Sequence, residues 1–285
     1  MFFYRRKDGK KVKGLEGVER LMPIFLPSRE GSVNKYLFSE STKYFDDYIK
    51  LKKETDGIHY SYRDIVIAIM VRCLKCLPRL NRFITAKRFY QRNSIDIAMM
   101  VHRSIKGDTP EVVAKATFIG DETISEVKDI FDDAINAAIK TSTESDKTAT
   151  KMSKMPMFLL KASVRMLRIF DHFGWLSKKF LFKVSPFHSS IFFTDLKSIG
   201  IEYIFHHLYN FGNCPFFVAL GKEQVVPVVN NDGQVVADKV FQMGLSIDDR
   251  CIDGLYLAFT LKLMRKIIRN LSVLERPPLD SEIKK

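Results

Sequence analysis

The stretch that decides the fold lies near the C-terminus and reads Leu245-Ser246-Ile247-Asp248-Asp249-Arg250-Cys251-Ile252-Asp253-Gly254. The largely apolar residues before it predict a strand over 234–247. Asp253-Gly254 then predicts the start of a helix that runs to about Leu271, because Asp favours the position before a helix. The motif therefore lies at the end of a strand, immediately before the final helix.

Outward from this motif, the chain alternates between strand-like and helix-like patterns. Strands are predicted at residues 33–39, 190–196, 214–220 and 225–229, and the last is joined to 234–247 by Asn230-Asn231-Asp232-Gly233, a hairpin signal. Residues 82–91 and 94–102 are predicted as paired strands with Asn93 in the turn. Helices are predicted at residues 44–53, 65–77 and 127–139, the last two after Ser61–Asp64 and Thr123–Glu126 capping boxes. This mixture predicts an α/β protein, a two-layer sandwich of a mixed β-sheet and helices.

Composition narrows the class of protein. The chain has 285 residues, with 46 Lys and Arg against 33 Asp and Glu, so its net charge is +13. Such a charge attracts nucleic acid, a membrane surface or a phosphate-bearing cofactor, and does not choose among them. The basic residues are spread along the chain and no nucleic-acid-binding motif occurs, so no nucleic-acid partner is expected. With no signal-peptide pattern and no apolar run of spanning length, we expect a cytoplasmic protein.

Cysteine and histidine patterns do not predict a metal. Cys73-Leu74-Lys75-Cys76 is a single CxxC within an apolar helical stretch, and no second pair completes a zinc site. His206 and His207 are adjacent, so their side chains should point apart. We therefore expect structural thiols and no metal.

A basic amphipathic segment occupies residues 157–183, within a divergent region at 141–185. Lys161, Arg165, Arg168 and His172 recur at helical spacing on one face, with apolar residues around them. Residues 141–154 before it are polar and predict a mobile loop. Two interpretations stay open: the segment binds a membrane or a partner protein, or it packs on its own domain with a solvated basic stripe.

Two blocks of residues resemble a known family. The motif at 245–254 is similar to the Leu-Ser-x-Asp-His-Arg and His-x-x-x-Asp-Gly signature of the dihydrolipoamide acyltransferase catalytic domains of 2-oxoacid dehydrogenase complexes, and more distantly to chloramphenicol acetyltransferase. Phe192-Phe193-Thr194-Asp195-Leu196-Lys197-Ser198-Ile199-Gly200 resembles the family's Phe-Thr-Ile-Ser-Asn-Leu-Gly-Ser-Phe-Gly. The resemblance covers roughly residues 20–275. It implies the chloramphenicol acetyltransferase-like fold of CoA-dependent acyltransferases.

The resemblance also implies a mechanism and an assembly. In the family, the His is a general base for a thiol or hydroxyl acceptor, and a Ser or Thr hydroxyl stabilises the oxyanion. Carried over, Thr194 serves the oxyanion and Asp253 holds the loop, while coenzyme A or acyl-CoA is a substrate. Family members are trimers whose active sites lie between subunits, so a homotrimer is expected.

Asp249 is where this chain departs from the family, because it stands at the position of the catalytic His. An Asp with a pKa of about 3.9 is a weaker base than a His of about 6.5. Burial and Asp248 would raise its pKa, whereas Arg250 would oppose that. His188, shortly before Thr194, is an alternative base.

These observations leave two hypotheses. The first is a CoA-dependent acyltransferase that moves an acyl group between CoA and a small thiol, hydroxyl or amine acceptor. The second is a catalytically impaired relative that acts as a ligand-binding, scaffold or membrane-associated protein, peripheral at the membrane through residues 157–183. We expect a basic lead-in at 1–20, an acyltransferase-like domain at 21–275 without lipoyl or subunit-binding domains, and a tail at 276–285.

Overall fold

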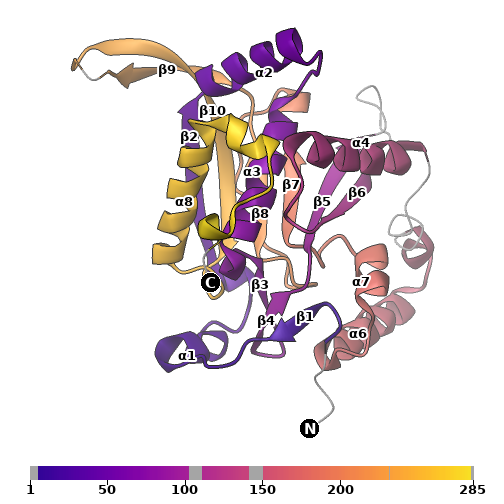
Figure 1. Cartoon of the computed structure of the whole chain (residues 1–285). Coiled ribbons are helices and arrows are strands. Elements are labelled where there is room, and N and C mark those ends of the chain that lie inside the picture. The colour runs from indigo at the N-terminus through magenta and orange to yellow at the C-terminus, as the bar shows by residue number, and fades with distance from the viewer. Residues whose placement is uncertain (1–5, 103–110, 141–149, 231, 284–285) are drawn as a thin grey trace.

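A computed structural model describes residues 6–102, 111–140, 150–230 and 232–283 (Figure 1). Its main sheet has the strand order β2-β10-β8-β7-β5-β6, with β9 paired to the outer part of β10. The strands are β2 (Val33–Ser41), β5 (Ile95–His102), β6 (Glu111–Phe118), β7 (Ile191–Asp195), β8 (Phe216–Leu220), β9 (Gln224–Val229) and β10 (Val235–Asp248). β7 runs parallel to β5 and β8, and the other pairs are antiparallel, so the predicted mixed sheet is confirmed.

Helices cover one face of this sheet (Figure 1). They are α2 (Lys43–Thr55), α3 (Tyr62–Cys76), α4 (Ile124–Lys140) and α8 (Gly254–Ile268). α3 is buried along almost its whole length, and its predicted capping box is present, because Ser61 Oγ accepts from the Asp64 amide and Asp64 accepts from that of Ser61. The apolar core between these helices and the sheet is the larger of two clusters.

The opposite face of the sheet is covered by an irregular segment, residues 201–214. A smaller apolar cluster lies beneath it, and its buried members are Ala98, Val113, Phe192, Leu208, Cys214 and Phe217. Gly244 of β10 permits this close approach, because a Cβ there would lie 1.8 Å from the carbonyl oxygen of Ile204. The segment therefore packs on the strand through a position that only glycine can fill.

Residues 82–102 differ from the prediction of two paired strands. β3 (Arg82–Thr85) and β4 (Arg88–Arg92) form their own hairpin, and β4 pairs with β1 (Gly9–Lys11) rather than with β5. The turn consists of Ala86 and Lys87, both at positive φ (53° and 55°), where glycine or asparagine is usual. The prediction was wrong because neither residue signals a turn.

The N-terminal and C-terminal segments also contribute structure. From Arg6 onward the expected lead-in packs on the domain: Arg6 and Asp8 are buried, and α1 (Gly17–Phe25) forms a helix that includes Pro23. In the expected tail, Arg276 forms an ion pair with Glu282 at 2.9 Å.

The divergent region contains α6 (Met157–Phe173) and α7 (Lys178–Val184), which lie at the lower right of Figure 1 beyond one end of the sheet. Of the loop predicted at 141–154, residues 141–149 lie outside the described residues, and 150–153 are helical.

Candidate active site

The turn after β10, residues 248–253, is built around a buried carboxylate. Asp248 is fully buried, and its two oxygens accept hydrogen bonds from Arg250 Nε and Nη2, both at 2.8 Å. Arg29 adds a second guanidinium, with Nε 3.5 Å from Asp248 Oδ2. The buried Asp248 carboxylate is held by two cations, and this fixes the turn at the end of the strand. We call residues 248–253 the Asp249 turn.

Asp253 joins this turn to α8. Its Oδ1 accepts from the amide of Tyr256 at 2.8 Å, so it is the N-cap that its sequence position predicted. Its Oδ2 accepts from Arg79 Nη2 at 2.7 Å. Arg79 comes from the short η2 helix (Pro78–Asn81), so the ion pair connects the turn to the end of α3.

Asp249 lies between these two anchored carboxylates and stays partly exposed. Its amide donates to the carbonyl of Ser32 at 2.9 Å, and its Oδ1 accepts from Asn34 Nδ2 at 2.6 Å. Burial raises the pKa of Asp249, and the negative charges of Asp248 and Asp253 add to this, whereas the Asn34 hydrogen bond opposes it. Arg250, which the sequence predicted to oppose the rise, is instead directed at Asp248. The fold thus makes Asp249 more basic than an ordinary Asp.

Thr194 is on β7 and lies at the other end of the sheet. With Phe192, it lines a cavity of about 480 Å³ that extends from Tyr209 and Phe217 to Arg63 of α3. Thr194 pairs with Ala219 of β8, and Ala219 in turn pairs with Gly244 of β10. Asp249 is five residues beyond Gly244 in the chain, which corresponds to about 16 Å along the strand direction at about 3.3 Å per residue. Within one chain, Thr194 and Asp249 are therefore apart.

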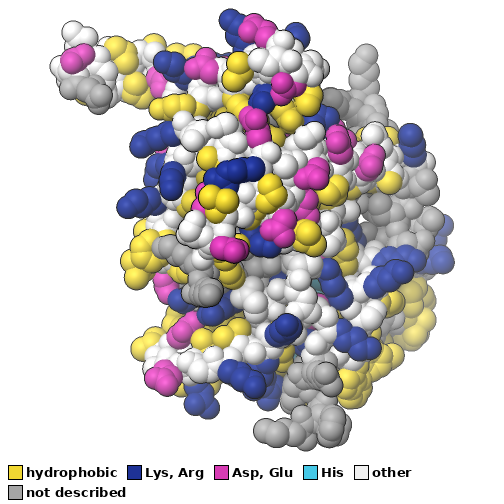
Figure 2. All heavy atoms as spheres, viewed as in Figure 1, with side chains coloured by type: hydrophobic (Ala, Val, Ile, Leu, Met, Phe, Trp, Pro, Cys, Tyr) yellow, Lys and Arg dark blue, Asp and Glu magenta, His cyan; other side chains and the backbone are white. Residues whose placement is uncertain are grey.

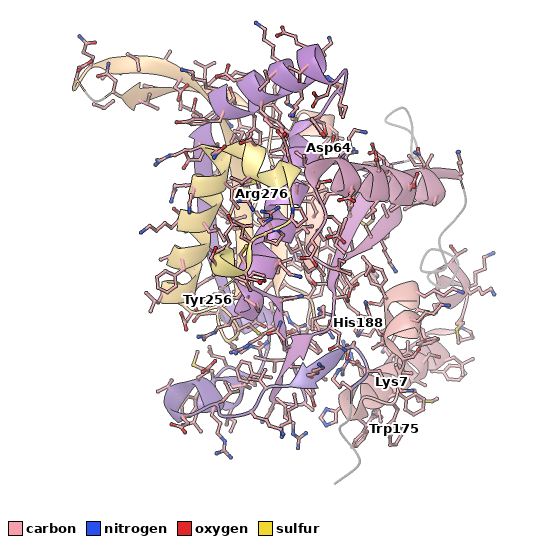
Figure 3. All side chains as sticks on the ribbon, in the orientation of Figure 1. Lys7, Asp64, Trp175, His188, Tyr256 and Arg276 are labelled. Carbon is pink, nitrogen blue, oxygen red and sulfur yellow. The ribbon has the colours of Figure 1, made fainter. Side chains whose placement is uncertain are left out.

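His188, the alternative base, contacts Asp171 of α6 rather than Asp249 or Thr194. It is buried just before β7, and its Nε2 is 3.6 Å from Asp171 Oδ2 on α6. Figure 3 shows it between the main body of the protein and the α6–α7 pair. Within the described residues, no hydrogen bond joins it to Asp249 or Thr194.

Sequence analysis did not single out Arg79, Asn34 or Arg29. Each lies more than 170 positions from the residue it contacts in the turn, and no local pattern marks such a partner. Across the described ranges, no group of three or more His, Cys, Asp and Glu side chains is arranged to hold a metal, and the four cysteines are buried free thiols. No helix in those ranges is long and apolar enough to cross a membrane.

Comparison with known proteins agrees with this architecture. A sequence model of the family described as 2-oxoacid dehydrogenases acyltransferase (catalytic domain) matches residues 212–275, which contain the Asp249 turn. No curated protein matches the chain.

Solved structures resemble nearly the whole chain. The cubic core of the pyruvate dehydrogenase multienzyme complex is 14% identical with a TM-score of 0.55, over 93% of this chain and 94% of that one. A probable dihydrolipoamide acetyltransferase from Listeria monocytogenes is 14% identical with a TM-score of 0.54, over 92% and 96%. A chloramphenicol acetyltransferase is 10% identical with a TM-score of 0.50, over 91% and 99%.

The protein thus has the fold of the chloramphenicol acetyltransferase-like, CoA-dependent acyltransferases. Within that class, the predicted resemblance to the 2-oxoacid dehydrogenase acyltransferase catalytic domain is confirmed, in sequence over residues 212–275 and in fold over the chain.

Proposed function

We propose that this protein is a CoA-dependent acyltransferase that moves an acyl group between CoA and a small thiol, hydroxyl or amine acceptor. The observation that carries the proposal is the Asp249 turn. Burial, and then the charges of the anchored Asp248 and Asp253, raise the pKa of the partly exposed Asp249 carboxyl, which stands at the position of the family's base. The +13 net charge suits the anionic phosphates of CoA.

In this mechanism the Asp249 carboxylate accepts the proton of the acceptor's thiol or hydroxyl. The freed sulfur or oxygen attacks the acyl-CoA carbonyl, and the Thr194 hydroxyl donates a hydrogen bond to the resulting oxyanion. The intermediate then collapses, the bond to the CoA sulfur breaks, and Asp249 returns its proton to that sulfur. Asp253 and Arg79 act as positioning residues, because they hold the turn and do not reach the reacting atoms.

The separation of Thr194 and Asp249 supports a site shared between copies of the chain. If Thr194 of one copy meets Asp249 of the next, both ends of the sheet contribute to each site. The ribbon of β9 and the first half of β10 projects from the body and exposes Val225, Val229 and Val235 to about 70% (Figure 1). Such a ribbon is marginally stable alone, so a neighbouring copy covering it suits the homotrimer that the resemblance implies.

The first test is calorimetry with CoA and acetyl-CoA, followed by turnover assays that detect the free CoA thiol. Thr194→Ala should lower kcat about 100-fold, since a single oxyanion donor is lost, while Thr194→Ser keeps the hydroxyl and most of the activity. Equal activity of the Ala and Ser variants would contradict the assignment of Thr194.

Subunit mixing tests the shared site. Thr194→Ala and Asp249→Asn are each expected to lose most of their activity, but refolding them together should restore up to about a quarter of the wild-type activity, because some interfaces then pair an intact Thr194 with an intact Asp249. No recovery in verified mixed oligomers would place the site within one chain instead.

A second candidate function is association with an anionic membrane surface through residues 157–183. α6 has no buried residue, and its outer side carries an apolar stripe, Phe158, Met166 and Ile169, beside the exposed basic side chains of Lys161 and Arg165. Figure 2 shows these two kinds of side chain gathered together at the lower right, and Trp175 follows at the end of α6 (Figure 3). Adjacent apolar and basic stripes are typical of interfacial helices, and like charge disfavours a second basic copy as the occupant.

Co-sedimentation with vesicles tests this candidate on the full chain. Binding to phosphatidylserine-containing vesicles should exceed binding to phosphatidylcholine vesicles, and Phe158→Asn with Met166→Asn should abolish the difference. Leu255→Asn, at an equally exposed apolar position on α8, is the control and should bind like the wild type. Equal sedimentation with both vesicle types would remove the membrane candidate.

A further inference from the structure

A cavity of about 300 Å³ lies between the α6–α7 pair and the body of the protein, behind the Asp249 turn. Four cationic side chains line it, from four different parts of the chain, against one carboxylate, Asp171; the cations are Arg29, Lys87, Arg168 and Arg250. His188 also lines it. The cavity includes none of Thr194, Asp249 and Asp253, so its chemistry is separate from the proposed transfer step.

The carboxylates near this cavity are already engaged. Asp248 has both oxygens on Arg250, so Arg29, which is 6% exposed, shares a carboxylate that another guanidinium holds more closely. Asp171 accepts from Arg6 Nη2 at 2.7 Å. Arg168 and Lys87, both exposed, form no ion pair within the described part of the chain, and Arg168 lies over the ring of Phe211, 5.9 Å from its centroid. At the cavity these two positive charges are therefore offset by solvent and not by a carboxylate among the described residues.

Two buried polar groups in the wall have unmet hydrogen-bonding capacity. His188 is 4% exposed; its Nε2 lies 3.6 Å from Asp171 Oδ2, too far for a hydrogen bond, and its Nδ1 has no partner among the described residues. Arg29 Nε has no hydrogen-bond partner and lies 3.5 Å from Asp248 Oδ2, whereas Nη1 donates to the carbonyls of Tyr209 and Gly212 and Nη2 donates to that of Ile84. Burial lowers the pKa of Arg29; Asp248 opposes this and Arg250 adds to it. Leaving buried donors unpaired is costly, and an anion in the cavity would satisfy them.

We propose that this cavity, between α6 and the Asp249 turn, is a binding site for a phosphoryl group carried by a small molecule, held by Arg29, Arg168 and His188. A phosphoryl group carries up to two negative charges, which match the two unpaired cations Arg168 and Lys87. The volume is at the lower end for small-molecule pockets, so the cavity holds a compact phosphorylated molecule or one phosphate of a larger molecule.

The experiment is calorimetric titration of the full chain with inorganic phosphate at ionic strength held constant with NaCl. We expect saturable binding of one phosphate per chain, about tenfold weaker in Arg168→Gln because one charge-assisted contact is lost. Arg165→Gln is the matched control: it is on the same helix, exposed, and outside the cavity lining, and should bind as the wild type does. His188→Gln, verified as folded by circular dichroism, should also weaken binding.

Equal weakening by Arg165→Gln and Arg168→Gln, or binding that does not saturate, would overturn the proposal. Acetate that binds as tightly as phosphate would overturn the phosphoryl assignment. CoA distinguishes the source of the phosphate: competition with inorganic phosphate would indicate a phosphate of that substrate, and independent binding would indicate a separate phosphorylated molecule. Because Thr194 and Asp249 are untouched in these variants, loss of transfer activity and loss of this site are distinguishable.

Discussion

In the Asp249 turn, a fully buried carboxylate is held by Arg250, two residues away, and by Arg29, whereas α6 is 17 residues long, buries none of them, and is tied to the N-terminal segment through Asp171. Asp171 reaches across 165 positions to Arg6. The turn is therefore an integral part of the core, and α6 is an attached element. The Asp249 turn and α6 form two walls of the same cavity. We expect the wall formed by α6 to open at a lower free energy than the wall formed by the turn.

Asp248→Asn should produce the largest effect and tests how far the turn depends on its buried charge. Removing the carboxylate leaves Arg250 and Arg29 buried with no full negative charge between them, so we expect a loss of about 3–5 kcal/mol in the free energy of unfolding. Urea denaturation measures it. A loss similar to that of a surface substitution such as Asp129→Asn would show that the turn does not rest on this charge.

Asp171→Asn should have a smaller and more local effect. Arg6 keeps Asp8, so we expect a loss of about 2 kcal/mol, seen as faster hydrogen exchange over α6 and α7 but not over β10. Burial acts to raise the pKa of Asp171, but His188 and Arg6 hold it below the usual range. The attachment should therefore be complete above pH 4 or so and weaken only as pH falls well below the pKa of an ordinary Asp. Uniform exchange changes would contradict the comparison.

Asp253→Ala removes both the N-cap hydrogen bond and the ion pair with Arg79, whereas Arg79→Gln removes the ion pair alone. We expect a loss of about 1–2 kcal/mol in the free energy of unfolding for Asp253→Ala, and of less than about 1 kcal/mol for Arg79→Gln because the ion pair is partly exposed. Thermal unfolding of both variants measures the order. An Arg79→Gln loss as large as that of Asp253→Ala would mean that the ion pair, rather than the cap, holds the turn on the helix.

Asp249→Asn should change stability least, by less than about 0.5 kcal/mol, because the side chain is partly exposed. The pH dependence is the sharper measurement. The raised pKa of Asp249 means that its carboxyl is protonated more readily in the folded protein than in an ordinary Asp. Activity that needs the carboxylate as a base should therefore be lost, as pH falls, at a pH above the usual pKa of Asp. In Asp249→His, the acidic limb of the rate profile should move to higher pH, toward about 6.5. An unshifted limb would exclude residue 249 as the base.

Local sequence alone determined much of this protein. Period-2 and period-3.6 apolar patterns, the Ser61 and Thr123 capping boxes and the Asn230 to Gly233 turn predicted most elements, because each depends on neighbours within a few positions. The motif at 245–254 also predicted the strand end, the N-cap Asp253 and the family resemblance.

Tertiary structure decided the rest. It paired β4 with β1, placed Thr194 and Asp249 at opposite ends of the sheet, and brought Arg79, Arg29 and Asn34 to the turn. It also left the outer side of α6 exposed, which the amphipathic pattern did not decide. The physical reason is the same in each case: these arrangements rest on contacts between residues far apart in the chain, whose free energy is gained only when the whole fold brings them together.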